Sequence, residues 1–249
     1  MSLNWPRLGV GTMPTAQFLI GARTMPKTDI RDQPAYTLAE AARYLKVAPA
    51  TLRSWVIGRT YPKGSGLAHA SALIDPAHNP PPTLSFWNLI EAHVLRSLRT
   101  DHGVSMDALR KSIKYAQHTL KIDRLLLRTE LRTDGGRLLL ERYGELIELS
   151  ASGQMAIRRT FNEHLARVDW DEWQFPVRLY PFAGVTQRDR PVSIDPQVAF
   201  GRPTLNGKGV TTATIASRID AGELVADIAD DYDLTEQDIE EAVLYERAA

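Results

Sequence analysis

The chain has 249 residues, of which 43% are hydrophobic and 24% charged, the balance of an ordinary globular protein with room for several small domains. It has no cysteine, which excludes disulfides and thiolate chemistry, and no apolar run of about 18 residues, the length that a membrane helix needs. Its first residues lack the basic-then-apolar plan of a signal peptide, so we expect a cytoplasmic protein.

A net charge of zero conceals two halves of opposite sign. Residues 1–128 carry 17 lysines and arginines against 8 aspartates and glutamates, a net charge of +9. Residues 129–249 carry 13 against 22, a net charge of −9. This asymmetry indicates one half that faces nucleic acid and another that faces a different partner. The alternative is two solvated surfaces of opposite sign that pack on each other.

We expect residues 1–33 to form a lead-in segment, because they are rich in Thr, Pro, Met and Gly without a sustained period. Helical patterning begins after Thr37, a good N-cap, and Glu40 completes a capping box. Residues 46–48 end this helix, and Pro49 begins a second one that runs through Trp55. Two short helices joined by a tight turn are typical of a helix-turn-helix.

The rest of the N-terminal half predicts a wing and a second pair of helices. Residues 58–82 are irregular and rich in proline, which favours a loop or wing. Helical patterning returns between Leu84 and Leu98. Another helix is expected to begin at Ser105, as its N-cap, and to continue to Leu120.

The pattern changes after Arg128, and we expect a central region at residues 129–183. Two strands at 130–133 and 137–140 flank a glycine turn, and a third candidate strand at 145–149 extends them to an antiparallel β-meander. A helix is predicted near 152–168, followed by extended chain at 169–182 and a linker at 184–190.

Residues 191–249 are acidic, with 4 lysines and arginines against 12 aspartates and glutamates, a net charge of −8. Three helices are predicted: the first ends at Gly222, the second contains Ile228, and the third opens at Thr235 with a capping box. The third helix should turn Ile239, Val243 and Leu244 inward. The predicted fold class is therefore α+β and mainly helical.

The sequence from Tyr36 to Trp55 resembles the opening of a MerR-like winged helix-turn-helix, and residues 84–110 resemble that family's second helix pair. The resemblance implies a DNA-binding domain at residues 34–128. It also implies a homodimer that forms through a helix after the wing, here within 105–127.

The residue types agree with that resemblance. A recognition helix needs small or polar side chains near its start to approach base edges, and cations nearby to bind phosphates. We expect Arg43 and Lys46 to border the same surface as Arg59 and Lys63 of the wing. The alternative is that Leu52 and Trp55 simply bury the second helix in a helical bundle. The candidate DNA-binding residues are Thr37, Arg43, Lys46, Ala50, Thr51, Arg53, Ser54, Arg59 and Lys63.

The acidic segment resembles a small helical domain that occurs in many VapB-type antitoxins. The resemblance is carried by Ile194-Asp195-Pro196, Gly201-Arg202-Pro203, Ala221-Gly222-Glu223 and Asp231-Tyr232-Asp233-Leu234-Thr235. The chain departs from this family after Asn206-Gly207, where it has Lys208-Gly209 in place of the usual Thr-Arg. The resemblance implies an antitoxin that binds its operator DNA, represses its own operon and neutralises a PIN-like ribonuclease toxin by direct contact.

Two modes of neutralisation stay open. Acidic side chains could mimic RNA phosphates against a basic toxin cleft, or arginines could pair with the toxin's metal-binding carboxylates. The acidic face of the last helix argues against a second DNA contact, since phosphates would repel it. The candidate toxin-binding residues are Arg188, Arg190, Arg202 and Lys208.

We expect no catalytic site, no metal site and no cofactor. The six histidines lie in separate segments without metal-ligand spacing: His69, His78, His93, His102, His118 and His164. No set of nucleophile, base and oxyanion donor is apparent. The alternatives to an antitoxin are a stand-alone MerR-like transcriptional regulator that responds to a small ligand and a nucleic-acid-processing enzyme with an unrecognised site.

Overall fold

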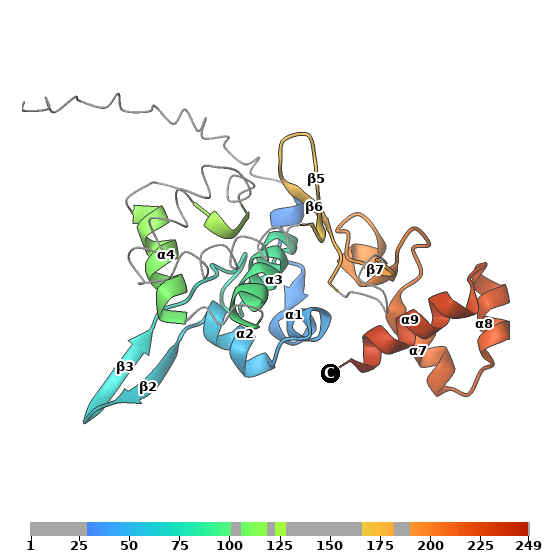
Figure 1. Ribbon diagram of the computed structural model, residues 1–249, viewed down its shortest axis with the longest axis horizontal. Coiled ribbons are helices and arrows are strands. Elements are labelled where there is room, and N and C mark those ends of the chain that lie inside the picture. Colours follow the sequence, from blue (N-terminus) through green and yellow to red (C-terminus); the bar gives the residue numbers. More distant parts are fainter. Residues whose placement is uncertain (1–28, 101–105, 119–122, 128–165, 182–189, 249) are drawn as a thin grey trace, which may run out of the picture.

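The computed structural model describes residues 29–100, 106–118, 123–127, 166–181 and 190–248 (Figure 1). The strands predicted at 130–133, 137–140 and 145–149 lie outside the described residues. So do nearly all of the helix predicted near 152–168, most of the lead-in segment and most of the linker. Among the described residues the architecture is a mixture of helices and four two-stranded antiparallel sheets, and no helix is long and apolar enough to cross a membrane.

The first two helices form as the sequence predicts. Helix α1 (Leu38–Leu45) begins after Thr37, whose hydroxyl accepts a hydrogen bond from the Glu40 amide at 3.2 Å. In return the Thr37 amide donates to Glu40 Oε2 at 2.9 Å, so two amides that no helical carbonyl reaches are satisfied. α1 ends at Lys46, whose φ of 52° is left-handed. Helix α2 (Pro49–Val56) starts with proline, where the missing N–H costs no hydrogen bond.

Helix α3 (Phe86–Thr100) lies at the centre of the N-terminal part, and α1 and α2 pack their apolar faces into the same core. Strand β1 (Tyr36–Thr37) pairs with strand β4 (Thr83–Leu84), which fixes the start of α1 beside the start of α3. The second predicted helix of this pair is also present, as α4 (Met106–His118).

A β-hairpin projects from this helical core (Figure 1). Strand β2 (Arg59–Lys63) pairs antiparallel with strand β3 (Gly66–Ala70), and Lys63 lies opposite Gly66. Gly64 in the turn has a φ of 60°, a left-handed conformation that glycine adopts without steric cost. The loop or wing predicted at residues 58–82 is therefore a β-hairpin followed by irregular chain.

A buried tryptophan joins segments that lie far apart in the sequence. Trp87 on α3 is fully buried, and its ring stacks on Phe175 with the centroids 5.5 Å apart. The guanidinium carbons of Arg31 and Arg124 each lie 5.4 Å from the centroid of the Trp87 ring. We call these four side chains the Trp87 cluster. A cation over a desolvated aromatic face contributes about 2 kcal/mol, so the cluster is a substantial tie between segments.

Carboxylates neutralise both guanidinium groups of the Trp87 cluster. Arg31 Nη1 lies 2.6 Å from Asp171 Oδ2, and Arg124 Nη2 lies 3.2 Å from Glu91 Oε2. Glu91 is only 5% exposed, and a buried carboxylate without a cation would be costly. The first pair joins the 3-10 helix η1 (Ile30–Asp32) to Asp171, and the second holds Arg124, just before the 3-10 helix η2 (Leu125–Leu127), beside α3.

The stretch predicted to be extended forms a hairpin of strands β5 (Val168–Trp170) and β6 (Pro176–Leu179). Val168 was expected at the end of a helix, and this prediction is wrong. It lies in β5 opposite Leu179 because its side chain packs into the main core, where it is 4% exposed. Leu179 also exchanges two backbone hydrogen bonds with Ile194, at 3.0 and 2.8 Å, which link this hairpin to the C-terminal part.

The C-terminal part contains strands β7 (Val192–Ser193) and β8 (Thr204–Leu205), which pair antiparallel, and the short 3-10 helix η4 (Ala199–Gly201) between them. Three helices follow, as the sequence predicts: α7 (Thr212–Asp220), α8 (Val225–Tyr232) and α9 (Glu236–Arg247). They share a second small core, formed by Leu205, Ile215, Ile228, Ala229, Ile239 and Ala242.

One predicted orientation on α9 is wrong. Ile239 is buried and Val243 half-buried, but Leu244 is 49% exposed. The adjacent Tyr245 is fully buried instead. Successive side chains on a helix point about 100° apart, so the burial of Tyr245 against α1 turns Leu244 toward solvent.

The turn at η4 has an unusual backbone, with a positive φ at three successive residues. These angles are 47° at Ala199, 57° at Phe200 and 73° at Gly201. A Cβ added to Gly201 would lie 2.1 Å from the hydroxyl oxygen of Tyr36, so only glycine fits between this turn and β1. Phe200 is 91% exposed and gains no packing from its position.

We predict opposite outcomes for neighbouring substitutions in this turn. Gly201→Ala should lower the free energy of unfolding by about 2 kcal/mol or more, because the methyl group overlaps Tyr36 and the left-handed backbone disfavours alanine. Phe200→Gly should leave stability unchanged or raise it by up to about 1 kcal/mol, because glycine relieves strain. Urea denaturation measures both, and a Gly201→Ala protein as stable as the wild type would contradict the described packing.

Candidate functional site

Helix α2 and the β2–β3 hairpin carry exposed cations on neighbouring elements. α2 buries Leu52, Trp55 and Val56, whereas Arg53 on its other face is exposed. Leu52 and Trp55 thus anchor the helix without covering its outer face. Arg59 at the base of the hairpin is exposed, with its guanidinium carbon 5.5 Å from the ring centroid of Tyr61.

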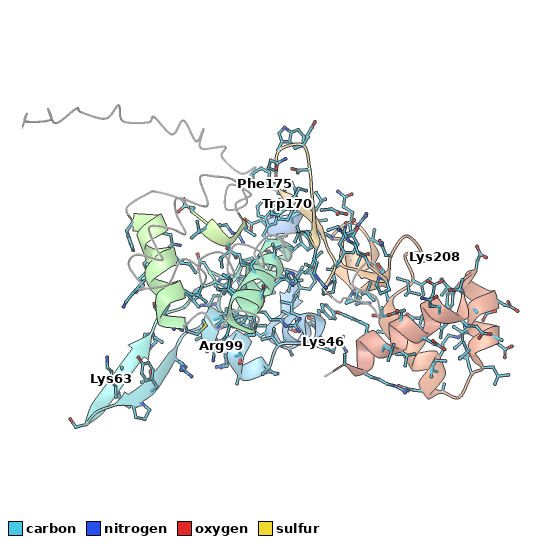
Figure 2. The ribbon with its side chains drawn as sticks, in the orientation of Figure 1. Lys46, Lys63, Arg99, Trp170, Phe175 and Lys208 are labelled. Atoms are coloured by element: carbon cyan, nitrogen blue, oxygen red, sulfur yellow. The ribbon has the colours of Figure 1, made fainter. Side chains whose placement is uncertain are left out.

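The remaining predicted DNA-binding residues of α2 are small or already bonded to the backbone. Ala50 is exposed and Thr51 is half-buried. The Ser54 hydroxyl donates to the Thr51 carbonyl at 2.7 Å, so it is satisfied within the helix. Lys63 lies at the outer end of the hairpin (Figure 2). Arg53, Arg59 and Lys63 form no ion pair with any described residue, which leaves their charges available to a ligand.

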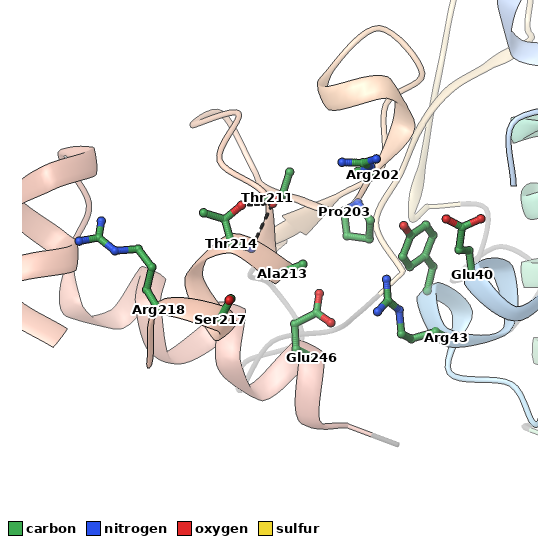
Figure 3. Close-up of a pocket in the computed structure, with 11 residues that line it drawn as sticks. Glu40, Arg43, Arg202, Pro203, Thr211, Ala213, Thr214, Ser217, Arg218 and Glu246 are labelled. Atoms are coloured by element: carbon green, nitrogen blue, oxygen red, sulfur yellow. Dashed lines mark hydrogen bonds between the residues drawn. The ribbon is translucent and has the colours of Figure 1, made fainter. Parts of the chain in front are cut away.

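Arg43 and Lys46 do not border this surface, contrary to expectation. Lys46 Nζ lies 4.3 Å from the ring centroid of Tyr245 on α9, and burial lowers the pKa of its ammonium group. Arg43 lies over Tyr44, 5.3 Å from that ring's centroid, on the side of α1 that faces the C-terminal part (Figure 3). Thr37 is occupied by the capping box of α1. The predicted cations are thus divided between two faces.

A buried tyrosine joins the two parts of the chain. Tyr245 Oη donates a hydrogen bond to the Tyr44 carbonyl at 2.8 Å, and the Tyr245 side chain is fully buried. Burial raises the pKa of the Tyr245 phenol well above its ordinary value, so the hydroxyl stays protonated and able to donate. The ring of Tyr44 in turn meets Tyr36 edge to face, with centroids 6.2 Å apart. We call this set of contacts the tyrosine junction.

A groove of about 520 Å³ opens beside the tyrosine junction (Figure 3). Glu40 and Arg43 of α1 form one wall, and Arg202, Thr214 and Glu246 belong to the C-terminal part. The pKa of Glu40 is lowered, first by the hydrogen bond from the Thr37 amide and to a lesser degree by the charges of Arg43 and Arg202. The groove therefore mixes cations and anions, and Arg43 and Arg202 both act electrostatically on Glu40.

The predicted toxin-binding residues differ in their availability. Arg190 donates to the Ala166 carbonyl at 2.7 Å and lies 3.4 Å from Asp169. Lys208 Nζ donates to the Asp233 carbonyl at 2.8 Å, which ties a turn to the end of α8. Arg202 is exposed and lines the groove, and its guanidinium group forms no ion pair or hydrogen bond with a described residue. Arg188 lies outside the described residues.

The sequence pattern did not single out the tyrosine junction or the exposure of Phe200. Tyr44 and Tyr245 both fit the apolar periodicity of their helices, so their contact across 201 positions leaves no local signal. Phe200 next to Gly201 was the one available hint of an unusual turn.

Of the six histidines, His102 and His164 lie outside the described residues. Among the residues that the structure does describe, no group of three or more His, Asp or Glu side chains is placed to hold a metal ion.

Comparisons with known proteins match both parts of the chain. Residues 34–113 match a family model described as "Putative DNA-binding HTH domain", and residues 192–245 match one described as "Protein of unknown function (DUF433)". The first match confirms the predicted helix-turn-helix, and its range includes both helix pairs and the hairpin.

A sequence comparison and a structure comparison each match a Mycobacterium tuberculosis protein over most of the chain. "Putative antitoxin VapB45" of strain ATCC 25618 / H37Rv is 30% identical over 231 residues, which are 85% of this chain and 93% of that protein. The crystal structure of Rv2018 is 26% identical with a TM-score of 0.61, and the match covers 84% of this chain and 97% of that chain.

The tyrosine junction makes a prediction about stability. Tyr245→Phe leaves the ring but removes the donor to a buried carbonyl, which should cost about 1–2 kcal/mol and lower the Tm by several degrees. Tyr61→Phe on the hairpin is the matched control and should leave the Tm unchanged. Thermal denaturation followed by circular dichroism makes the comparison. Equal Tm values for Tyr245→Phe and the wild type would contradict the junction.

Proposed function

The chain belongs to the family of VapB-type antitoxins, and from this membership we propose that it is the antitoxin of a type II toxin–antitoxin pair. In this proposal it represses its own operon by binding operator DNA as a homodimer, and neutralises a PIN-like ribonuclease toxin by direct contact. It performs no catalysis itself. Residues 34–128 form the DNA-binding domain of MerR-like type, and residues 191–249 form the toxin-docking domain.

The observation that carries the DNA-binding proposal is the exposure of Arg53, Arg59 and Lys63 on α2 and the adjacent hairpin. In a winged helix-turn-helix, the second helix enters the major groove while the wing contacts the backbone. We assign Arg53, with Ala50 and Thr51, to the groove. Arg59 and Lys63 would bind phosphates, which position the protein without selecting the sequence.

The positions of the basic hairpin and the acidic helices support separate binding sites for DNA and for the toxin. The β2–β3 hairpin and helices α7 to α9 lie at opposite ends of the long axis (Figure 1). Helix α9 presents exposed carboxylates, among them Glu236 and Glu240, which DNA phosphates would repel. A DNA duplex bound at the hairpin end would leave the acidic end free for a protein. This arrangement favours a ternary complex over mutually exclusive binding.

We predict that the cations of α2 and the hairpin govern the salt dependence of operator binding. Lys63→Ala should weaken binding about tenfold and reduce the slope of log K against log salt concentration by about one, because it removes a phosphate contact. Arg53→Ala should also weaken binding about tenfold, because it removes a base contact, and should change that slope less. Fluorescence anisotropy with the promoter DNA of the chain's own operon, at several salt concentrations, measures both quantities.

Arg43→Ala is the matched control, because Arg43 faces α9, and it should leave the slope unchanged. Arg53→Ala should also neutralise the ribonuclease in an RNA-cleavage assay as well as the wild type does. The assignment fails if Arg43→Ala lowers the slope while Lys63→Ala does not, or if Arg53→Ala binds the operator as tightly as the wild type does. Failure of the wild-type chain to inhibit the ribonuclease encoded beside it would instead favour a stand-alone regulator.

A further inference from the structure

Phe200 is the most exposed large apolar side chain among the described residues, at 91%. Its backbone is left-handed, with φ of 57°, and so is that of Ala199 before it. A left-handed conformation disfavours residues with a Cβ, and an exposed aromatic ring gains nothing from the fold. A strained backbone that displays an apolar side chain is a pattern that folding stability alone does not explain.

The turn that carries Phe200 is rigidly held on both sides. Asp195 accepts the Gln197 amide at 2.9 Å and lies 3.0 Å from Arg178 of β6. Gly201 packs directly on Tyr36, and its amide donates to the Val198 carbonyl at 2.9 Å. Because the backbone is fixed before any partner arrives, little conformational entropy is lost when the ring is covered.

The guanidinium groups of Arg202 and Arg43 form no ion pair with a described residue, whereas the other described cations of the C-terminal part are engaged. Lys208, Arg218 and Arg247 bind the Asp233 carbonyl, the carboxylates of Glu223 and Asp231, and Asp220, respectively, and Arg190 lies 3.4 Å from Asp169. Arg202 has no such partner among the described residues, and the same holds for Arg43 across the groove. Both guanidinium groups are therefore available for a second molecule.

We propose that Phe200, Arg202 and Arg43 form the docking site for the toxin, which rests on the proposed antitoxin function. Phe200 is the aromatic anchor, and it enters an apolar pocket on the toxin surface. Arg202 and Arg43 pair with carboxylates at the rim of that pocket. Aromatic rings and arginines that lose their water on binding supply most of the energy at protein interfaces.

The chemistry of this site favours a protein partner of a different kind over a second copy of the chain. If the turn lay on a two-fold axis it would meet its own copy, and the Arg202 side chains of the two molecules would approach each other. Nucleic acid is disfavoured because Glu40 and Glu246 line the same groove and would repel a continuous phosphate backbone, whereas a protein can place single carboxylates beside Arg202 and Arg43 only. A protein partner that has an apolar pocket with carboxylates at its rim can bury the Phe200 ring and pair with the Arg202 and Arg43 guanidinium groups at the same time.

Affinity for the toxin tests this proposal. The full chain and its Phe200→Ala and Arg202→Ala variants are titrated with the ribonuclease encoded beside the chain's gene, by isothermal titration calorimetry. Each variant should weaken binding at least about tenfold. Leu224→Ala and Arg247→Ala are the matched controls, since Leu224 is 67% exposed on the same part and Arg247 is already paired; both should bind as the wild type does.

Anisotropy with operator DNA and size-exclusion chromatography with light scattering accompany the titrations. Unchanged DNA affinity and oligomeric state in Phe200→Ala would exclude misfolding as the cause of weakened toxin binding. Wild-type toxin affinity in both variants overturns the docking site but leaves the antitoxin function intact. If Phe200→Ala no longer forms a homodimer but still binds the toxin, Phe200 lies in a contact between two copies of the chain and the docking site is overturned. If the wild-type chain binds no toxin, both the docking site and the antitoxin function are overturned.

Discussion

The hydrogen bond from the buried Tyr245 phenol to the Tyr44 carbonyl fixes helix α9 against helix α1. An aromatic side chain of this kind buries about 150 Å² or more, which at about 25 cal/mol per Å² corresponds to roughly 4 kcal/mol as an upper estimate. The contact draws Lys46 under the Tyr245 ring and leaves Arg43 on the same side of α1. Of the cations predicted to bind DNA, Arg53, Arg59 and Lys63 on α2 and the hairpin are therefore the ones that lie away from this contact.

The Trp87 cluster likewise holds distant segments together, here around a side chain of α3. It gathers η1, η2 and the β5–β6 hairpin around one ring, and that hairpin continues through Leu179 and Ile194 into the C-terminal part. The C-terminal part is therefore attached to the N-terminal part through Ile194, through Gly201 on Tyr36 and through Tyr245. Several attachments restrict rotation far more than one linker would, so the groove between α1 and the η4 turn is a defined surface.

Local patterns predicted the helices of the described residues better than the strands, because helix signals lie within a few residues. Capping boxes form at Thr37 and Thr235, and α2 begins with the proline that the sequence marks as its start. Helices α3 and α4 form where the apolar periodicity predicted them. Contacts between distant segments could not be predicted this way. Nothing near Lys46 reveals that Tyr245 will cover it, and the rotation of α9 that exposes Leu244 follows from the same distant contact. The strain at Phe200 likewise depends on Tyr36, which excludes every residue but glycine at position 201.

The central claim is that one chain presents separate surfaces to DNA and to a toxin. Hydrogen–deuterium exchange of the full chain, alone and with each ligand, tests it most directly because backbone amides report protection along the whole sequence. Operator DNA should slow exchange in residues 48–70 and leave 199–217 unchanged, whereas the toxin should slow exchange in 199–217 and leave 48–70 unchanged. Protection of residues 48–70 by the toxin, or of 199–217 by DNA, would contradict the division.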